Sequence, residues 1–495
     1  MNIKRLLPIA TLSVLVLFLW YRYRMAMTQH FDIDEYAYLH WASHITLGAV
    51  PFRDFFYILL PGFIWVLAPL FLIFPPLTLA PIYGARVLEF SIFVFLAAGV
   101  GFLFWQLRKS WIALLPALIL VFLPMPSIKF MEIRPDTLAM ALTVAAMVCL
   151  IGYIKQWKPA IGVGAGALYG LALLVSTKMV PAVAAAGGVL CIAAVLRKNM
   201  KIFFPPILGG VLVAGAYLVW VAATGGWHML DAMWYDVVVA SVEDGINLGR
   251  LWPIPPDFFF RPNAYFYGVG SDAGRIVNNV LWGFGILIAV WRVFAAIIIR
   301  SGTWLQELIV GITFAAFGAF FLWTPLRHAQ YLIPLAVWVA WYAADGIYAL
   351  WILLCRTPVG TMVFAVLFVT GLSYLTHINS FVYKTRWVLP VDNTLDTVKS
   401  MWREIPTTEY VFDLEGITLY YPDPHYACCT MFGQIQPYLS RPFPDIAETL
   451  ERTHTNYVYQ GESGRINTLL LKDQAYILKH FEPWQGHPEL LVRKK

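Results

Sequence analysis

Three carboxylates stand close together, Asp32, Asp34 and Glu35, just after the first apolar run of the chain. Charged residues make up only 13% of the sequence, so such a cluster needs a physical reason. A carboxylate at the centre of a bilayer costs about 2.5–3.5 kcal/mol. At the mouth of a membrane bundle the same group can be solvated, bind a metal ion or take a proton from a substrate. The function of the chain depends on which of these the cluster does.

The spacing of the cluster fits a structural and a chemical role. Asp32 followed three residues later by Glu35 is a capping-box pattern, which predicts a helix over 36–47. Asp34 is not needed for this cap, and a positioned carboxylate can accelerate a reaction by roughly 10²–10⁴-fold through proton transfer. Asp32 and Asp34 flank one residue and can also share a divalent cation. We expect Asp34 to be the base, Asp32 and Glu35 to be supporting acids, and a divalent cation to be an open alternative.

A second charged group, from Glu132 to Asp136, lies between two predicted spans. Pro135 breaks the chain, and Asp136 is expected to cap a helix that begins at Thr137. On the functional interpretation, Glu132 and Asp136 share the membrane face of Asp34, with Asp136 as a further supporting acid. Arg134 is then available to bind a phosphate.

Basic residues also follow predicted spans on this face. Lys178 lies in a turn between two closely spaced spans, where it either extends to the interface or contacts a phosphate. Arg327 can hold a phosphate through two hydrogen bonds, and His328 can protonate it or donate to it. Together, these groups suit the deprotonation of a hydroxyl and the stabilisation of a departing lipid phosphate. The phosphate-binding candidates are Arg53, Arg134, Lys178, Arg327 and His328.

The composition is that of a polytopic helical membrane protein. The 495 residues are 60% hydrophobic, with a mean hydropathy of +0.67, whereas a soluble domain carries about 25% charged residues. The net charge of +6 is scattered, which argues against a nucleic-acid partner. No small-residue cleavage site follows the first apolar run, so a retained first helix is expected. About eleven spans are predicted, at 6–21, 83–107, 111–128, 137–154, 160–176, 179–196, 202–223, 276–299, 304–323, 329–349 and 359–376.

The distribution of basic residues predicts an orientation. The apolar run 57–75 is broken by prolines, and we interpret it as a juxtamembrane or re-entrant element. With this assignment the basic clusters after the spans all fall on the cytoplasmic side, together with the N-terminus. The acidic cluster, a long loop at 224–275 and the tail then share the outer face of a plasma or inner membrane. We expect no internal repeat.

Two domains are expected, a transmembrane catalytic domain over 1–376 and an outer soluble α/β domain over 377–495. Amphipathic patterns in the tail predict helices at 393–403, 444–453 and 469–480, and strands at 410–414, 457–460 and 490–493. Cys428 and Cys429 are expected to be two free thiols, with a vicinal disulfide as the alternative. The other three cysteines lie in apolar runs and are expected to be inert.

Several motifs resemble those of a known family. The stretch Asp34-Glu35-Tyr36 with Trp41-Ala42, then Gly48 to Pro51, Arg53-Asp54-Phe55 and Pro61, resembles the first outer loop of GT-C glycosyltransferases. The resemblance is to the protein-mannosyltransferase and lipid A aminoarabinose transferase group. Arg134-Pro135-Asp136, Thr177-Lys178 and 328–334 resemble elements that recur in that group in the same order. The resemblance covers roughly residues 6–350.

The resemblance implies an all-α GT-C-like bundle and sugar transfer from a polyprenyl-phosphate donor, with inversion at the anomeric carbon. The acceptor would be a lipid, a glycan or a protein at the outer membrane face. Asp34 matches the acidic residue of the first outer helix, which is thought to act near the acceptor, and Arg53, Lys178, Arg327 and His328 match the donor phosphate by position. Relatives often carry Lys-Pro-Pro where this chain has Leu59-Leu60-Pro61-Gly62. A transporter or flippase of lipid-linked saccharides and a saccharide polymerase or ligase remain alternatives.

Overall fold

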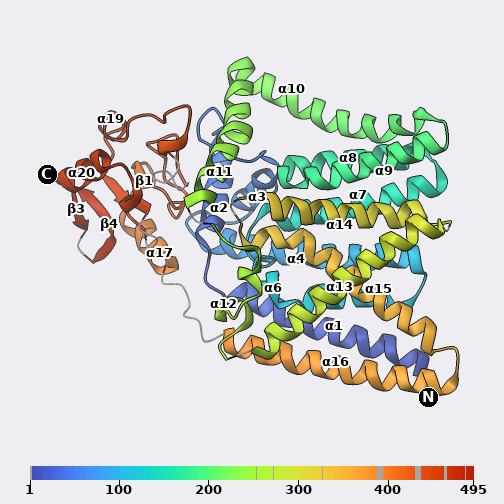
Figure 1. The fold of residues 1–495 in the computed structure, drawn as a ribbon. Helices are drawn as coiled ribbons and strands as arrows, with labels where there is room; N and C mark the ends of the chain where they lie inside the picture. The colour runs from blue at the N-terminus through green and yellow to red at the C-terminus, as the bar shows by residue number, and fades with distance from the viewer. Residues whose placement is uncertain are drawn as a thin grey trace.

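A bundle of long helices carries a small α/β unit at one end (Figure 1). The computed structural model describes residues 3–251, 253–270, 272–300, 302–325, 327–386, 394–429, 436–461, 465–484 and 486–494. Within them, nine helical segments are long and apolar enough to cross a membrane. They contain α1 (Ile3–Thr28), α4 (Ala80–Arg108), α7 (Pro135–Gln156), α9 (Val180–Leu196), α10 (Phe204–Trp234), α13 (Asp272–Ile299), α14 (Trp304–Trp323), α15 (Ile333–Leu354) and α16 (Pro358–Arg386). The predicted fold class is confirmed.

Two of the predicted spans are shorter helices inside the bundle, α5 (Leu114–Phe122) and α8 (Pro159–Val175). α8 packs against α10 at very close range, because glycines stand where the two helices touch. A Cβ atom on Gly166 would lie 1.8 Å from the Pro206 carbonyl oxygen, and one on Gly209 would lie 2.0 Å from that of Val163. Small residues of this kind let membrane helices approach through their backbones.

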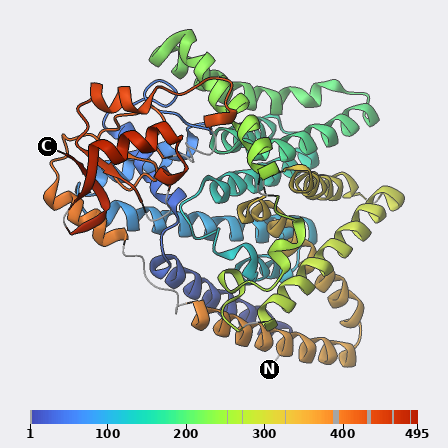
Figure 2. The ribbon, with the colours of Figure 1, turned by 60° about the vertical axis from the view of Figure 1, so that its left-hand side comes forward.

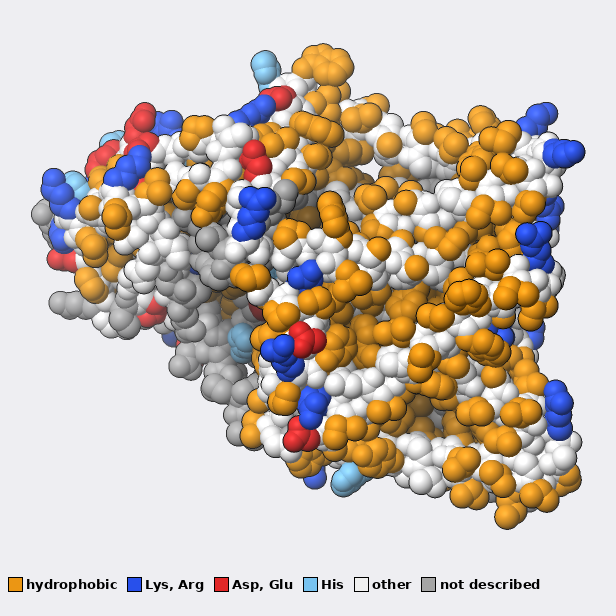
Figure 3. All heavy atoms as spheres, viewed as in Figure 1, with side chains coloured by type: hydrophobic (Ala, Val, Ile, Leu, Met, Phe, Trp, Pro, Cys, Tyr) orange, Lys and Arg blue, Asp and Glu red, His pale blue; other side chains and the backbone are white. Residues whose placement is uncertain are grey.

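The two ends of the bundle differ in charge. Figure 3 shows a broad apolar surface, with basic side chains along the edge farthest from the α/β unit. Eight of the basic residues close to the ends of α4, α7, α9, α13 and α15 are Arg108, Lys109, Lys155, Lys158, Arg197, Lys198, Arg300 and Arg356. The clusters that the sequence assigns to one side of the membrane therefore follow helices that end at one side of the bundle.

The segment 224–275 is largely helical, so the prediction of a long loop is wrong. α10 bends at Gly226, where φ is +62°, and then continues to Trp234. A π-helical segment at Tyr235–Ala240 and α11 (Ser241–Leu251) follow, and α12 (Ala264–Tyr267) precedes α13. Gly225 and Gly226 are typical of a chain break, but here they only bend a helix that resumes at once.

The tail folds into a four-stranded sheet with the strand order β1-β2-β4-β3. β1 (Val411–Asp413) pairs in parallel with β2 (Tyr457–Tyr459), and β4 (His487–Arg493) is antiparallel to β2 and to β3 (Phe481–Trp484). The helices are α17 (Thr394–Glu404), α19 (Ile446–Arg452) and α20 (Leu471–His480). The predicted helices and strands are all found, although residue 393 lies outside the described residues. β3 was not predicted, because its four residues include Pro483.

Two further expectations concern short segments. Cys428 and Cys429 form a vicinal disulfide, so the expectation of free thiols is wrong. α3 (Gly62–Ile73) occupies the proline-broken run, and its 12 residues extend about 18 Å, which is too short to cross a bilayer of about 30 Å. The predicted division at 376/377 falls inside α16.

α2 (Ile33–Thr46) lies at the end of the bundle that carries the α/β unit (Figure 1). In Figure 2 this unit, coloured orange to red, comes forward beside the blue segment that contains α2. Two α2 histidines contact tail residues directly, since His40 bonds to Asp423 and His44 to the Tyr421 carbonyl. The helix that begins at the acidic cluster is therefore packed between the membrane helices and the tail.

Candidate functional site

The capping box at the start of α2 forms as predicted. The Asp34 amide donates to the Asp32 carboxylate at 3.0 Å, and the Asp32 amide donates to the Glu35 carboxylate at 2.9 Å. Glu35 does more than cap, because it is fully buried and paired with Arg86 of α4 in two hydrogen bonds of 2.6 and 2.5 Å. It also accepts the Ile133 amide at 2.7 Å. Glu35 thus fastens α2 to a membrane helix and to the segment before α7.

Arg134 connects the acidic residues of the two sequence motifs. Its guanidinium donates to Asp34 at 2.7 Å, to Asp32 at 3.0 Å and, through Nε, to Glu132. Lys129 lies beside it and donates to Glu132 at 2.7 Å and to Asp32 at 3.1 Å. Burial alone would raise the pKa of Asp32, but Arg134 and Lys129 outweigh it and hold that pKa well below its usual range. Asp32 is therefore ionised at neutral pH.

Asp34 differs from the other described carboxylates of this cluster in its exposure. Its side chain is 42% exposed, compared with 21% for Asp32, 1% for Glu132 and 0% for Glu35. Arg134 holds only one of its oxygens, Oδ2, while the Nη2 atom of Arg465 lies 4.0 Å from Oδ1. Asp34 is thus held through Oδ2 by Arg134, with a cation of the tail near Oδ1 and a side chain that stays partly exposed.

Lys178 and His328 lie on the same side of the molecule, close to this cluster. The Lys178 ammonium pairs with Asp136 at 2.8 Å and lies 4.7 Å from the centre of the Tyr331 ring. Asp136 therefore does not cap α7, which begins at Pro135; its carboxylate is used by Lys178 instead. Burial, and after it the charge of Lys178, lowers the pKa of His328 to about 4. His328 is thus a neutral imidazole at pH 7, able to donate one hydrogen bond.

Arg53 and Arg327 make other contacts. Arg53 is exposed and pairs with its neighbour Asp54 at 2.6 Å. Arg327 donates to the carbonyl oxygens of Phe321 and Leu322 at the end of α14 and to that of Ile254. No hydrogen bond or ion pair between described residues joins either arginine to the Asp34 cluster.

The site was also expected to be able to hold a cation between Asp32 and Asp34. Arg134 already bridges these two carboxylates, and Lys129 contacts the second oxygen of Asp32. The positive charges of Arg134 and Lys129 thus already contact the oxygens that a divalent ion would need, and they repel such an ion. In the part of the chain that the structure describes, the groups that could hold a metal lie elsewhere, around His40 and the tail.

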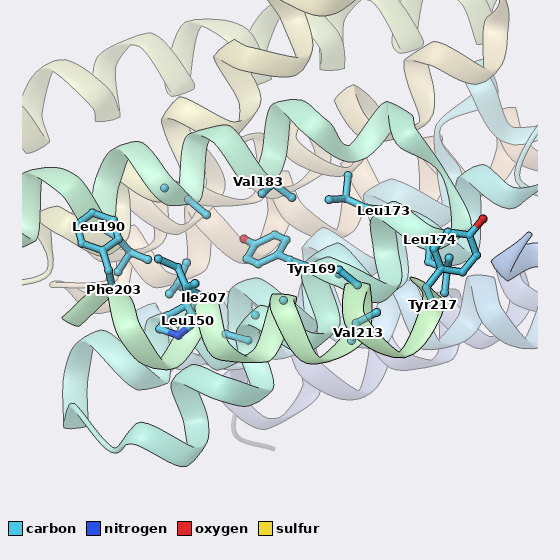
Figure 4. Close-up of a pocket in the computed structure, with 18 of the residues that line it drawn as sticks. Leu150, Tyr169, Leu173, Leu174, Val183, Leu190, Phe203, Ile207, Val213 and Tyr217 are labelled. Atoms are coloured by element: carbon cyan, nitrogen blue, oxygen red, sulfur yellow. The ribbon is translucent and has the colours of Figure 1, made fainter. Parts of the chain in front are cut away.

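An apolar cavity of about 460 Å³ lies among α7, α8, α9 and α10 (Figure 4). Tyr169 lies near its middle, with Leu190 and Phe203 toward one end and Leu174 and Tyr217 at the other. Lys178 stands only four residues beyond Leu174, in the turn that connects α8 to α9. One end of the cavity therefore points toward the charged cluster.

Sequence reasoning missed several groups that complete the site. Arg86 is a charged residue inside an apolar run, and a charge in such a place is by default a sign of function or of a specific partner. Lys129 stands three residues before Glu132, the spacing of a helical ion pair. Tyr265 donates to Glu132 at 3.1 Å, and Arg465 approaches Asp34 from the tail. No local signal identifies these last two, because they lie more than 100 residues from their partners.

No family model matches the chain, and no curated protein matches it by sequence. Its fold, however, matches solved structures over nearly its whole length. ArnT from Cupriavidus metallidurans bound to undecaprenyl phosphate is 12% identical, with a TM-score of 0.59, and the match covers 98% of this chain and 97% of that one. The archaeal oligosaccharyltransferase AglB from Archaeoglobus fulgidus, in complex with an inhibitory peptide and a dolichol-phosphate, is 12% identical, with a TM-score of 0.52, over 98% of this chain and 74% of that one.

The same oligosaccharyltransferase in complex with Zn and sulfate has a TM-score of 0.53 at 12% identity, over 97% of this chain and 71% of that one. These likenesses show that the chain shares the fold of these proteins. The predicted fold, a helical membrane bundle with a small C-terminal α/β unit, is confirmed.

Proposed function

We propose that this chain, which shares the fold of ArnT and AglB, is a glycosyltransferase. It would move a sugar from a polyprenyl-phosphate donor to an acceptor hydroxyl or amide. The observation that carries this proposal is the geometry of Asp34, a half-open carboxylate held through one oxygen by Arg134. Both structural relatives were solved with a polyprenyl-type phosphate, undecaprenyl phosphate in ArnT and a dolichol-phosphate in AglB.

The proposed reaction is a single displacement that inverts the anomeric carbon. Asp34 takes the acceptor proton as the acceptor atom bonds to the anomeric carbon, while the bond from that carbon to the phosphate oxygen breaks. The polyprenyl phosphate leaves with the bonding electrons, and its developing negative charge needs nearby donors. Lys178 and His328, which lie together near Asp34, supply one cation and one neutral hydrogen-bond donor.

The apolar cavity is suited to hold the lipid chain of the donor. Its size falls in the range of ligand pockets, roughly 300–1,000 Å³, and its walls are almost entirely apolar. With the lipid chain in the cavity, the phosphate would emerge at the turn that carries Lys178. The proposed donor thus spans from the membrane interior to the charged cluster.

Filling the cavity should weaken donor binding. A Cβ atom on Gly187, which lines the cavity, would meet no atom within 4 Å, so Gly187→Leu adds bulk without a clash at its first atom. Displacing two methylene groups of lipid costs about 1.6 kcal/mol, so we expect the KM for the donor to rise by roughly tenfold, with little change in kcat. Donor titrations of purified protein measure this effect.

Gly188→Leu is the matched control, because Gly188 is also free of neighbours within 4 Å but does not line the cavity. If both leucine variants change the KM equally, the cavity does not hold the donor.

The proposed orientation puts the Asp34 end and the tail on the outer face, because the basic residues gather at the opposite end. Sealed vesicles of known orientation test the reaction and the orientation together. We expect right-side-out vesicles to consume a water-soluble short-chain donor that is added outside, and inverted vesicles to consume it only after detergent opens them.

The other outcomes of the vesicle experiment are distinct. Consumption by inverted vesicles alone would overturn the orientation. Movement of the donor across the membrane without transfer would indicate a flippase. If detergent-opened vesicles consume no donor even with a mixed pool of lipid, glycan and peptide acceptors, the proposed transferase function is wrong.

A further inference from the structure

Two histidines of α2 and one aspartate of the tail form a buried cluster outside the proposed catalytic site. His40 and His44 are four residues apart, so that both rings lie on one face of the helix, with their centres 4.0 Å apart. Asp423 reaches this face from the tail. The side chains of the three residues are only 0%, 8% and 10% exposed, respectively.

The ligand atoms of the cluster all lie within 4.8 Å of one another. Nε2 of His40 lies 2.9 and 3.0 Å from the two oxygens of Asp423, and Nδ1 of His44 lies 3.4 Å from the nearer oxygen. In a tetrahedral zinc site, with bonds of about 2.0–2.2 Å, neighbouring ligand atoms are about 3.3 Å apart. The observed separations are close to this value, so an ion needs only small side-chain shifts to bind here.

The hydrogen bonding of His44 selects the nitrogen that a metal requires. Its Nε2 atom lies 2.9 Å from the carbonyl oxygen of Tyr421, which can only accept a hydrogen bond, so Nε2 carries the proton. In the neutral ring, Nδ1 then presents a lone pair to the Asp423 oxygen. Two electron-rich atoms in this arrangement repel each other unless a metal ion or a proton lies between them. A backbone carbonyl on the far nitrogen is also the usual support of a metal-bound histidine.

Two sulfur ligands lie next to this group. Cys428 and Cys429 are buried. Their two sulfur atoms and a ring nitrogen of His40 all lie within 4.8 Å of one another. Nδ1 of His40 has no hydrogen-bond partner among the described residues. The two sulfurs form a disulfide in this structure, and after reduction they would offer thiolates, which zinc binds well.

We propose that His40, His44 and Asp423 bind a divalent transition-metal ion, with zinc as the best chemical match, which fastens the tail to α2. Nitrogen and carboxylate ligands in a compact set suit zinc better than magnesium or calcium, which prefer oxygen alone. The site is independent of the proposed transferase function, since neither its ligands nor its chemistry involve Asp34. It adds a fixed point two turns along the helix that begins at the Asp34 cluster.

Cobalt provides a direct test on the purified full-length protein. The protein is treated with a chelator and then titrated with Co²⁺, whose visible absorption reports a tetrahedral site. We expect one saturable site, displacement of cobalt by Zn²⁺, and a zinc-dependent rise in the unfolding temperature that the chelator reverses. Asp423→Asn and His44→Gln should each weaken cobalt binding at least about 100-fold. His228→Gln, which changes an exposed histidine, should leave it unchanged.

Two outcomes overturn the proposal without relying on the variants. If the wild-type chain shows neither a tetrahedral cobalt spectrum nor stabilisation by zinc, a proton alone holds the cluster together. If cobalt binds but His44→Gln and Asp423→Asn keep wild-type affinity, the ion is bound elsewhere. Repeating the titration under reducing conditions adds a strong sulfur-to-cobalt band only if the two cysteines join the site.

Discussion

Asp34→Asn is expected to lower sugar transfer by roughly 10²–10⁴-fold, the contribution of a positioned general base. The amide keeps the shape of the carboxylate and can still accept a hydrogen bond from Arg134, so the fold and donor binding should change little. The loss should therefore appear in kcat rather than in the KM for the donor. Initial rates with purified protein and a labelled polyprenyl-phosphate sugar measure it.

Asp257→Asn is a suitable control, because Asp257 is an exposed carboxylate that pairs with Arg261, not with the cluster. It should leave the rate unchanged. If Asp34→Asn transfers sugar at the wild-type rate, another group takes the proton. The glycosyltransferase function would still be supported, because the assay itself measures sugar transfer.

Arg86→Met is expected to have the largest effect on stability. Arg86 and Glu35 are both fully buried, and removing one partner of such a pair leaves an uncompensated charge, which costs about 3–5 kcal/mol. Arg86 also donates to the backbone carbonyl oxygens of Ala26 and His30, and these bonds are lost as well. We expect the midpoint of thermal unfolding in detergent to fall by on the order of 5 °C or more.

The double variant Arg86→Met with Glu35→Leu distinguishes charge from shape. Replacing both partners removes the buried charges together, so it should recover part of the lost stability. Arg261→Met, at an exposed pair, should change the midpoint little. If Arg86→Met unfolds at the wild-type temperature, the pair does not fasten α2 to α4.

Local patterns in the sequence were enough to predict much of this protein. The apolar runs give the bundle because each is long enough to span a bilayer, and the capping box gives the start of α2 because its hydrogen bonds join residues three apart. The elements of the tail other than β3 follow from their periodicity. The predicted role of Asp34 also rests on local spacing, and it stays a prediction.

The rest of the site depends on contacts between distant segments. Asp136 has the residue type of a helix cap, yet its carboxylate pairs with Lys178, 42 residues later. Asp423 meets His40 across 383 residues, and nothing near either residue predicts that contact. Arg86 is the exception, since a lone arginine in a membrane run already indicates that a carboxylate partner exists somewhere in the chain.

The order in which the chain is made suits the buried pair of Glu35 and Arg86. Glu35 precedes Arg86 by 51 residues, so the carboxylate has always left the ribosome before the guanidinium does. An arginine that entered the bilayer alone would oppose the insertion of α4. Because its partner is synthesised first, on α2, the carboxylate is available to neutralise this charge when α4 inserts.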